Sequence, residues 1–280
     1  DMQRQLFNNV SVNCSKLVTK AYSTSFSMAV KTLAPSIRNA IYSIYGFVRF
    51  ADEIVDTFHD HDKEKLIHDF ERNYYIGFKD GVSLNPILNA FQLTVKKYNI
   101  TDDLIQAFLR SMKQDLHKVN YTAAEFNNYI YGSADVVGLM CLKVFVNGDD
   151  KQYEELKDSA MRLGSAFQKV NFLRDLKDDV EMLNRSYFPG INILNLDHNA
   201  KIKIVKEIEE DFEMALEGIK KLPKEAKFGV YTAYAYYMSL LNKLKRTPSN
   251  EIINTRVRVS NPQKFGLLAK SFVTYKLNLL

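Results

Sequence analysis

Apolar side chains recur along this chain at steps of three and four residues, which is the spacing of one face of an α-helix. The chain has only 11 glycines and six prolines in 280 residues, and this scarcity of turn formers disfavours an all-β fold. We therefore predict an all-α protein that forms one domain over residues 1–280. Helices are predicted most clearly over 57–78, 85–98, 101–116, 154–179 and 200–222.

The N-terminal end and the cysteines add little to this picture. We treat residues 1–15 as a lead-in, with Asp1 as a residue added ahead of a natural start at Met2. No basic segment followed by an apolar one is visible, and no apolar run reaches the ~20 residues of a bilayer span. Cys14 and Cys141 form no paired motif and fit a reducing compartment. A cytoplasmic protein is expected, with peripheral membrane association as a further expectation.

The charge balance favours anionic partners without choosing among them. The net charge is +5, which suits diphosphates or an acidic membrane surface. Nucleic acid is disfavoured because the chain has neither a block of Lys and Arg nor a nucleic-acid motif. An ordinary basic protein would show the same balance, so charge alone assigns no function.

An acidic pair closes the otherwise apolar and aromatic segment over 41–56. Asp52 and Asp56 are four residues apart and therefore share one helix face, which Tyr45 and Arg49 extend backwards. Two such charges repel mildly, but a magnesium ion held between them and a phosphate would make the pair favourable. A solvated helix face is the alternative, and the apolar neighbours disfavour it.

A second polar line lies over 168–179. Asn171, Asp175 and Asp179 recur every four residues, Gln168 precedes them by about one turn, and Arg174 lies beside them. Acids and amides flanked by apolar residues make a poor core but suit a metal and a diphosphate. One Asp-x-x-x-Asp is weak evidence by itself, and two such faces in one chain are much stronger.

Together these motifs resemble those of the squalene/phytoene synthase family. The resemblance extends over about 22–264 and includes an N-terminal Ser-x-Ser-Phe, a central helix break, an Arg-x-Tyr-Phe-Pro segment and a C-terminal basic segment. The matching residues are Asp52–Asp56, then Asn171, Arg174, Asp175 and Asp179, then Tyr22–Phe26, Tyr131-Gly132 with Val137-Gly138, Arg185–Pro189, Arg256-Val257 and Lys264.

The resemblance implies an isoprenoid-synthase helical bundle around a central hydrophobic cavity, with the two acidic faces opposed at its mouth. It implies two or three Mg²⁺ ions, with Mn²⁺ as a substitute, held by Asp52, Asp56, Asn171, Asp175 and Asp179. The four aspartates, Tyr45 and Arg49 would be catalytic. Diphosphate would be bound by Arg49, Arg174, Arg256, Lys264, Tyr237, Ser23 and Ser25. Tyr22 and Thr24 stand where other members carry His and Lys, and Gln168 extends the second face.

Aromatic side chains would stabilise a carbocation in the dry cavity. Phe26, Tyr45, Phe47 and Tyr131 are expected to line it, although most of the 18 Phe and 16 Tyr must be plain core. Val30 lies one turn after Phe26, and a small residue there would leave room for a twenty-carbon chain.

The expected reaction joins two geranylgeranyl diphosphates into phytoene through a cyclopropyl diphosphate, without a nicotinamide. Two farnesyl diphosphates giving dehydrosqualene or squalene are the alternative, and a non-catalytic relative that binds partners is a third reading. A di-iron bundle is disfavoured because no Glu-x-x-His pair occurs. We expect a monomer whose partners are prenyl diphosphates.

Overall fold

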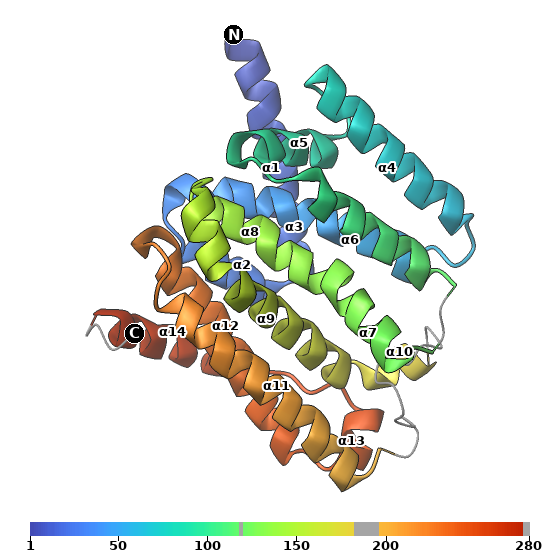
Figure 1. The fold of residues 1–280 in the computed structure, drawn as a ribbon, viewed down its shortest axis with the longest axis vertical. Helices are drawn as coiled ribbons and strands as arrows, with labels where there is room; N and C mark the ends of the chain where they lie inside the picture. The colour runs from blue at the N-terminus through green and yellow to red at the C-terminus, as the bar shows by residue number, and fades with distance from the viewer. Residues whose placement is uncertain (118–119, 182–195, 277–280) are drawn as a thin grey trace.

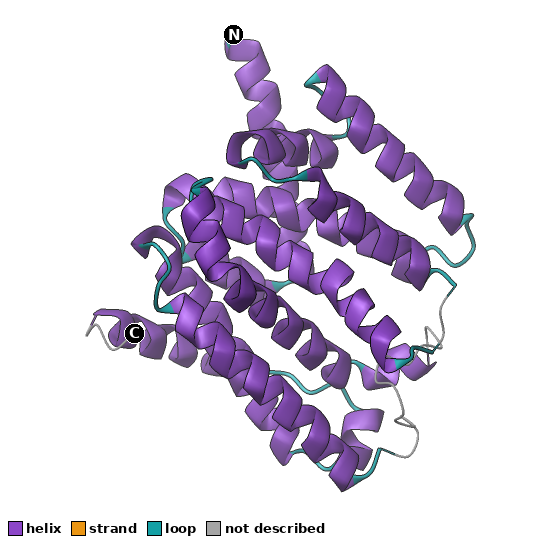
Figure 2. Ribbon diagram, viewed as in Figure 1, coloured by secondary structure: helices purple, strands orange, loops and turns teal. Residues whose placement is uncertain are grey.

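The computed structural model describes residues 1–117, 120–181 and 196–276, and helix is the only regular structure within these ranges (Figure 2). The prediction of an all-α protein is confirmed. The first half contains α1 (Met2–Tyr22), α2 (Thr24–Lys31), α3 (Pro35–Asp56), α4 (Lys63–Asp80), α5 (Pro86–Tyr98), α6 (Asp102–Asp115) and α7 (Ala123–Ile130). A π-helical turn, η1 (Tyr131–Asp135), leads into α8 (Val136–Phe145). The remainder contains α9 (Asp150–Arg174), α10 (Leu176–Glu181), α11 (His198–Ile219), α12 (Lys224–Arg246), α13 (Ser249–Asn254) and α14 (Asn261–Lys276).

Helix boundaries follow capping chemistry more closely than apolar spacing. Asn85 caps α5, where its side chain accepts hydrogen bonds from the amides of Ile87 and Leu88 at 3.0 and 3.2 Å. The helix predicted over 57–78 begins only at Lys63, because Asp62 caps it there. The helix predicted over 154–179 begins earlier, at Asp150, and is interrupted at Asp175, after which α10 continues as a separate helix, so its continuity was predicted wrongly.

Two buried clusters fill the bundle. One lies among α2–α6, α8 and the start of α9, and it surrounds the fully buried Phe47 of α3. The Phe47 ring stacks on Phe91 of α5 at 3.9 Å and on Phe70 of α4 at 5.2 Å, measured between ring centroids. The other cluster lies among α7, the end of α9, α11, α12 and α13. Helix α9 contributes to both clusters and contacts α8 on one side and α11 on the other (Figure 1).

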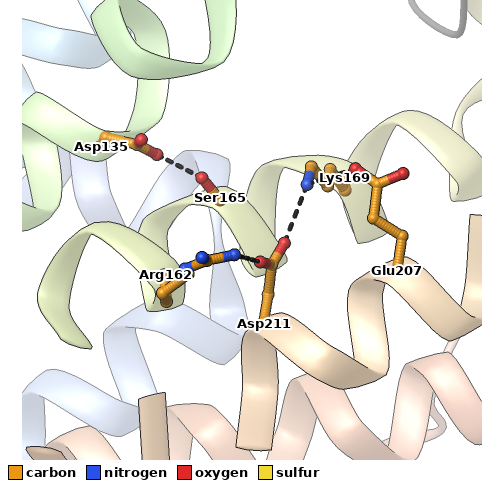
Figure 3. A network of polar contacts seen from close by, with 6 residues as sticks. All are labelled: Asp135, Arg162, Ser165, Lys169, Glu207 and Asp211. Carbon is orange, nitrogen blue, oxygen red and sulfur yellow. Dashed lines mark hydrogen bonds and ion pairs between the residues drawn. The ribbon is translucent and has the colours of Figure 1, made fainter. Parts of the chain in front are cut away.

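A buried network of charges ties α9 to its neighbours (Figure 3). Lys169 donates to Asp211 of α11 at 2.8 Å and to Glu207 at 2.7 Å, and Arg162 donates to the other oxygen of Asp211 at 2.9 Å. On the other side of α9, the Ser165 hydroxyl donates to Asp135 of η1 at 2.5 Å. Burial raises the pKa of Asp135 to about 7, although the Ser165 hydrogen bond and the Lys169 charge oppose the rise.

Helices long and apolar enough to cross a bilayer are absent from the part of the chain that the structure describes.

Candidate active site

An apolar cavity of about 280 Å³ lies between the two clusters. Its walls come from α2, α3, the η1–α8 segment, α9, the end of α11 and α12. Most lining side chains are aliphatic, aromatic or small. The polar ones include Tyr45 and Asp52 of α3, Gln168 and Asn171 of α9, and Tyr237 of α12. The predicted hydrophobic cavity is therefore present, and residues from both predicted faces border it.

The residues of the first face follow the predicted helical spacing, because α3 continues without a break to Asp56. Tyr45 and Asp52 line the cavity, and Asp56 lies one turn further along, half-buried. Burial raises the pKa of Tyr45 well above its usual value, and the neighbouring Asp52 charge adds to the rise although Arg49 opposes it. Tyr45 is therefore a neutral hydrogen-bond donor at physiological pH, beside a carboxylate.

Arg49 is held in place by Glu53, a residue that was not predicted from the sequence. Its guanidinium is hydrogen-bonded to Glu53, whose other oxygen accepts from the Thr57 hydroxyl at 2.8 Å. The same guanidinium lies 4.6 Å from the centre of the Tyr22 ring. Burial by itself would lower the pKa of Arg49, but Asp52 and Glu53 outweigh it and raise the pKa. A permanent cation therefore stands beside Asp52.

On the second face, α9 directs its amides toward α12 and η1. The Tyr237 hydroxyl donates to Asn171 Oδ1 at 3.2 Å, and the Tyr237 ring stacks on Phe167 at 4.2 Å between centroids. The Gln168 amide nitrogen lies 3.5 Å from Ser133 Oγ of η1. Burial raises the pKa of Tyr237, although Arg174 and Asn171 partly oppose the rise. Gln168 and Asn171 thus share a face, as predicted.

The C-terminal end of this face differs from the prediction of one continuous helix, because α9 ends at Arg174, directly before Asp175. Asp175 is the C-terminal cap of α9, and α10 starts at the next residue. Its carboxylate accepts two hydrogen bonds from Arg174, both at 2.9 Å, and lies 3.3 Å from Nε of Arg256. Adjacent residues on a continuous helix point in different directions, so the break at Asp175 favours its pairing with Arg174. The side chain of Asp179 and the segment 185–189 lie outside what the structure describes.

The N-terminal Ser-x-Ser-Phe segment forms the first turn of α2. Ser23 caps this helix, its Oγ accepting from the Phe26 amide at 3.1 Å, and Thr24 and Ser25 follow in the first turn. The Phe26 ring stacks on Tyr45 at 4.9 Å between centroids, and both rings line the cavity together with Val30. The segment therefore packs against the first acidic helix.

Two predicted cavity aromatics lie elsewhere. Phe47 is two residues after Tyr45, and this spacing turns it to the opposite face of α3, into the aromatic core. Tyr131 is 37% exposed and is not part of the cavity lining, because η1 presents Ser133 and Ala134 there instead. A Cβ atom at Gly132 would lie 1.8 Å from Ser111 Oγ, so glycine is required where η1 packs on α6. Lys264 lies 5.8 Å from the centre of the Tyr236 ring.

The oxygen donors fit magnesium of the kind that bridges protein and substrate. No group of three or more Asp, Glu, His or Cys that could enclose a metal occurs among the described residues. Magnesium is commonly bound by one or two carboxylates, with phosphate and water oxygens completing its shell. Asp52 and Asp56 on α3, with Asn171 on α9 and Asp175 at its C-terminal cap, would supply hard oxygen ligands of this kind.

Comparison with known proteins identifies the family. The model of the squalene/phytoene synthase family matches residues 19–195. A 15-cis-phytoene synthase from Synechocystis sp. is 28% identical over 278 residues, covering 88% of this chain and 80% of the relative. A second, from Enterobacter agglomerans, is 26% identical over 270 residues and covers 88% and 90%.

Solved structures show the same fold. A dehydrosqualene synthase in complex with a ligand superposes with a TM-score of 0.82 at 20% identity, covering 96% of this chain and 98% of the other. Squalene synthase HpnC from Alicyclobacillus acidocaldarius gives 0.74 at 19% identity, covering 85% and 94%. The chain therefore belongs to the squalene/phytoene synthase family, and it is a prenyltransferase-type enzyme with an isoprenoid-synthase helical bundle.

Proposed function

We propose that this chain is a phytoene synthase, which joins two geranylgeranyl diphosphates head to head and releases diphosphate. The observation that carries the proposal is the apolar cavity bordered by Asp52 of α3 and Asn171 of α9, because the reaction needs an ionic mouth and a dry interior. The phytoene synthases matched over most of this chain support the twenty-carbon substrate. The proposal includes a monomeric, cytoplasmic enzyme.

In the first half-reaction, negative charge develops on the departing diphosphate at the mouth of the cavity. The C1–O bond of one substrate breaks, diphosphate leaves with the electron pair, and C1 bonds to the C2–C3 double bond of the other substrate. A proton is lost as the cyclopropane ring closes. Arg49, Arg174 and Arg256 supply positive charge near the proposed diphosphate sites. Magnesium, held by Asp52, Asp56, Asn171, Asp175 and Asp179, would neutralise the departing diphosphates.

The second half-reaction depends on the cavity walls. The remaining diphosphate leaves, the cyclopropyl carbocation rearranges, and loss of a proton gives the central conjugated triene. The stacked rings of Phe26 and Tyr45 lie along this wall and can stabilise positive charge. Because burial raises the pKa of both Tyr45 and Tyr237, these hydroxyls stay protonated, and we assign the released diphosphate as the proton acceptor.

The test is an assay of the purified protein with magnesium, geranylgeranyl diphosphate and no nicotinamide. We expect a forty-carbon product with a conjugated triene, identified by mass and ultraviolet spectrum. A thirty-carbon product from farnesyl diphosphate alone would replace the proposed substrate. No turnover of either substrate would favour a binding protein.

Val30 provides a test of chain length within the same assay. Its side chain lies in the cavity wall one turn beyond Phe26. Replacing it by Phe adds a ring to this wall, so we expect Val30→Phe to shift turnover from geranylgeranyl toward farnesyl diphosphate by about tenfold in relative kcat/KM. An unchanged preference would show that Val30 does not limit chain length.

A further inference from the structure

Helix α1 exposes four large apolar side chains, while the residues that it buries fully are small and polar. Its buried residues are Ser11, Ser15 and Thr19, which recur every four residues along one face. On the opposite face, Leu6 is 64% exposed and Leu17 is 69% exposed. Met2 and Val10 are also exposed large apolar residues, and together these four form what we call the outer stripe. A helix of a globular protein ordinarily has the reverse arrangement.

Contacts on the inner face require this orientation. Ser11 accepts a hydrogen bond from the buried Asn89 amide of α5 at 3.0 Å, and the same amide donates to Asn8 at 3.1 Å. A Cβ atom at Gly46 of α3 would lie 2.7 Å from Ser15 Oγ, so the helices approach too closely for larger side chains. The inner face packs closely against α3 and α5, and this packing fixes the rotation of α1. The outer stripe therefore faces outward.

Positive charge predominates on α1 and on two of the helices that pack against it. Helix α1 contains Arg4, Lys16 and Lys20 and no Asp or Glu. Helices α2 and α5, which pack against it, likewise contain no acidic residue and add Lys31, Lys96 and Lys97. The loop before α5, which Arg4 contacts through the Gly81 carbonyl at 3.1 Å, exposes Val82 and Leu84. Exposed apolar side chains with cations on the same and neighbouring helices suit an anionic lipid surface.

We propose that the outer stripe of α1 docks this protein on an anionic lipid bilayer. The apolar side chains would enter the headgroup region, and Lys16 and Lys20 would contact lipid phosphates. Self-association through the stripe is disfavoured, because a two-fold contact between two copies of α1 would place cations opposite cations with no acid to pair them. Figure 1 shows the first turns of α1 projecting beyond α5, which leaves this end accessible.

The position of α1 links this surface to the active site. Its last residue, Tyr22, contacts the Arg49 guanidinium beside the cavity mouth. A docked α1 would hold the mouth within one helix length of the bilayer. The benefit, delivery of a lipid substrate and removal of a lipid product, rests on the proposed function, whereas the docking itself can be measured without turnover.

The test is co-sedimentation of the full chain with phosphatidylcholine vesicles, with and without phosphatidylglycerol. We expect binding to the anionic vesicles and much weaker binding to the neutral ones. The double substitution Leu6→Gln with Leu17→Gln should weaken anionic-vesicle binding by about tenfold or more. The matched control is Ile202→Gln with Met214→Gln on α11, whose side chains are 50% and 47% exposed, and it should bind as the wild type does.

The unfolding temperature of each variant is measured as a control for folding. Neither double substitution should change it, because all four side chains are exposed. Failure of the wild type to sediment with anionic vesicles would overturn the proposal. So would equal binding to neutral vesicles, or equal weakening by the α11 pair. Light scattering without lipid tests for self-association. A wild-type dimer that becomes a monomer on Leu6→Gln with Leu17→Gln would show that the outer stripe binds a second copy of the chain and not a bilayer. Loss of vesicle binding with intact turnover of detergent-dispersed substrate would separate docking from catalysis.

Discussion

The two helices that carry the acidic faces differ in what holds them in place. Helix α3 is anchored by an aromatic cluster, in which Phe47 stacks on Phe91 and Phe70. Helix α9 also packs in both apolar clusters, but charged groups hold it in addition, through Lys169 and Asp211 on one side and Asp135 on the other (Figure 3). Apolar packing is insensitive to pH, whereas buried charges depend on protonation. The position of the second face should therefore respond to solution conditions that leave the first face unchanged.

The two faces also differ at their carboxylates. Asp52 and Asp56 are set by an unbroken helix, whereas Asp175 is set by Arg174 and Arg256 at a helix end. An ion entering the second face would compete with two guanidinium groups for Asp175. Both carboxylates of the first face are positioned by one continuous helix, and in this sense the first face is the more preorganised half of the site.

The largest expected effect is loss of activity on changing the preorganised carboxylate. Asp52→Asn keeps the shape of the side chain but removes its charge, and kcat should fall about 10³-fold, equivalent to about 4 kcal/mol. Steady-state kinetics with geranylgeranyl diphosphate, the substrate proposed above, provide the measurement. The control is Asp60→Asn in the exposed loop before α4, which should retain wild-type activity. Full activity in Asp52→Asn would remove the first face from the mechanism.

The next effect concerns how each helix is anchored. Lys169→Met leaves Asp211 buried without its main partner and should lower the free energy of unfolding by about 3 kcal/mol. Adding Asp211→Leu should restore most of this loss, because the remaining Arg162 is half-exposed and can be solvated. Phe47→Ala should cost a comparable amount, about 3–5 kcal/mol, through the cavity it leaves.

Denaturant unfolding of the single and double variants distinguishes the two anchors. Rescue of Lys169→Met by Asp211→Leu would confirm a charge-based anchor at α9. If the double variant were no more stable than Lys169→Met, packing of the Lys169 side chain would be the main contribution, and the contrast between the helices would disappear.

A smaller effect should appear in the pH dependence of stability. Because the pKa of Asp135 rises from 3.8 to about 7 on folding, the folded state holds a proton that the unfolded chain has released between these values. The folded state is therefore destabilised as pH rises through this window. From about pH 5 to about pH 8, the wild type should lose about 2 kcal/mol of stability relative to Asp135→Asn.

Asp135→Asn is informative because an amide oxygen can still accept the Ser165 hydrogen bond while carrying no titrating proton. The measurement is the difference in unfolding free energy between the two proteins at each pH. A difference that stays constant across the window would show that Asp135 titrates normally in the folded chain.

The sequence was sufficient for features that depend on local spacing. The helix over 85–98 was predicted within one residue, because Asn85 and Pro86 mark its start. Helix geometry predicted correctly that Tyr45 and Asp52 share one face of α3. The same geometry excludes Phe47 from the cavity, because it lies two residues after Tyr45. The pairing of Arg49 with Glu53 had a sequence signal as well, since they are four residues apart.

Features that depend on distant contacts could not be predicted in this way. Where α9 ends, Asp175 pairs with Arg256, a residue beyond α13. Apolar spacing continues through this point, so periodicity gave no sign of the break. Likewise, the inward polar face of α1 depends on Gly46 of α3 and Asn89 of α5, and α1 alone does not reveal which of its faces is buried.

The smallest expected effect separates the two guanidinium groups that hold Asp175. Arg174 is 17% exposed and makes both hydrogen bonds, whereas Arg256 is 43% exposed and makes one longer contact. Solvent weakens the exposed pair, so Arg256→Gln should lower kcat/KM about tenfold or less, and Arg174→Gln should lower it more. Added salt should weaken the contribution of Arg256 and leave that of Arg174 nearly unchanged. Equal effects of both substitutions at every salt concentration would mean that Asp175 is set by the helix end itself, and the second face would then be as preorganised as the first.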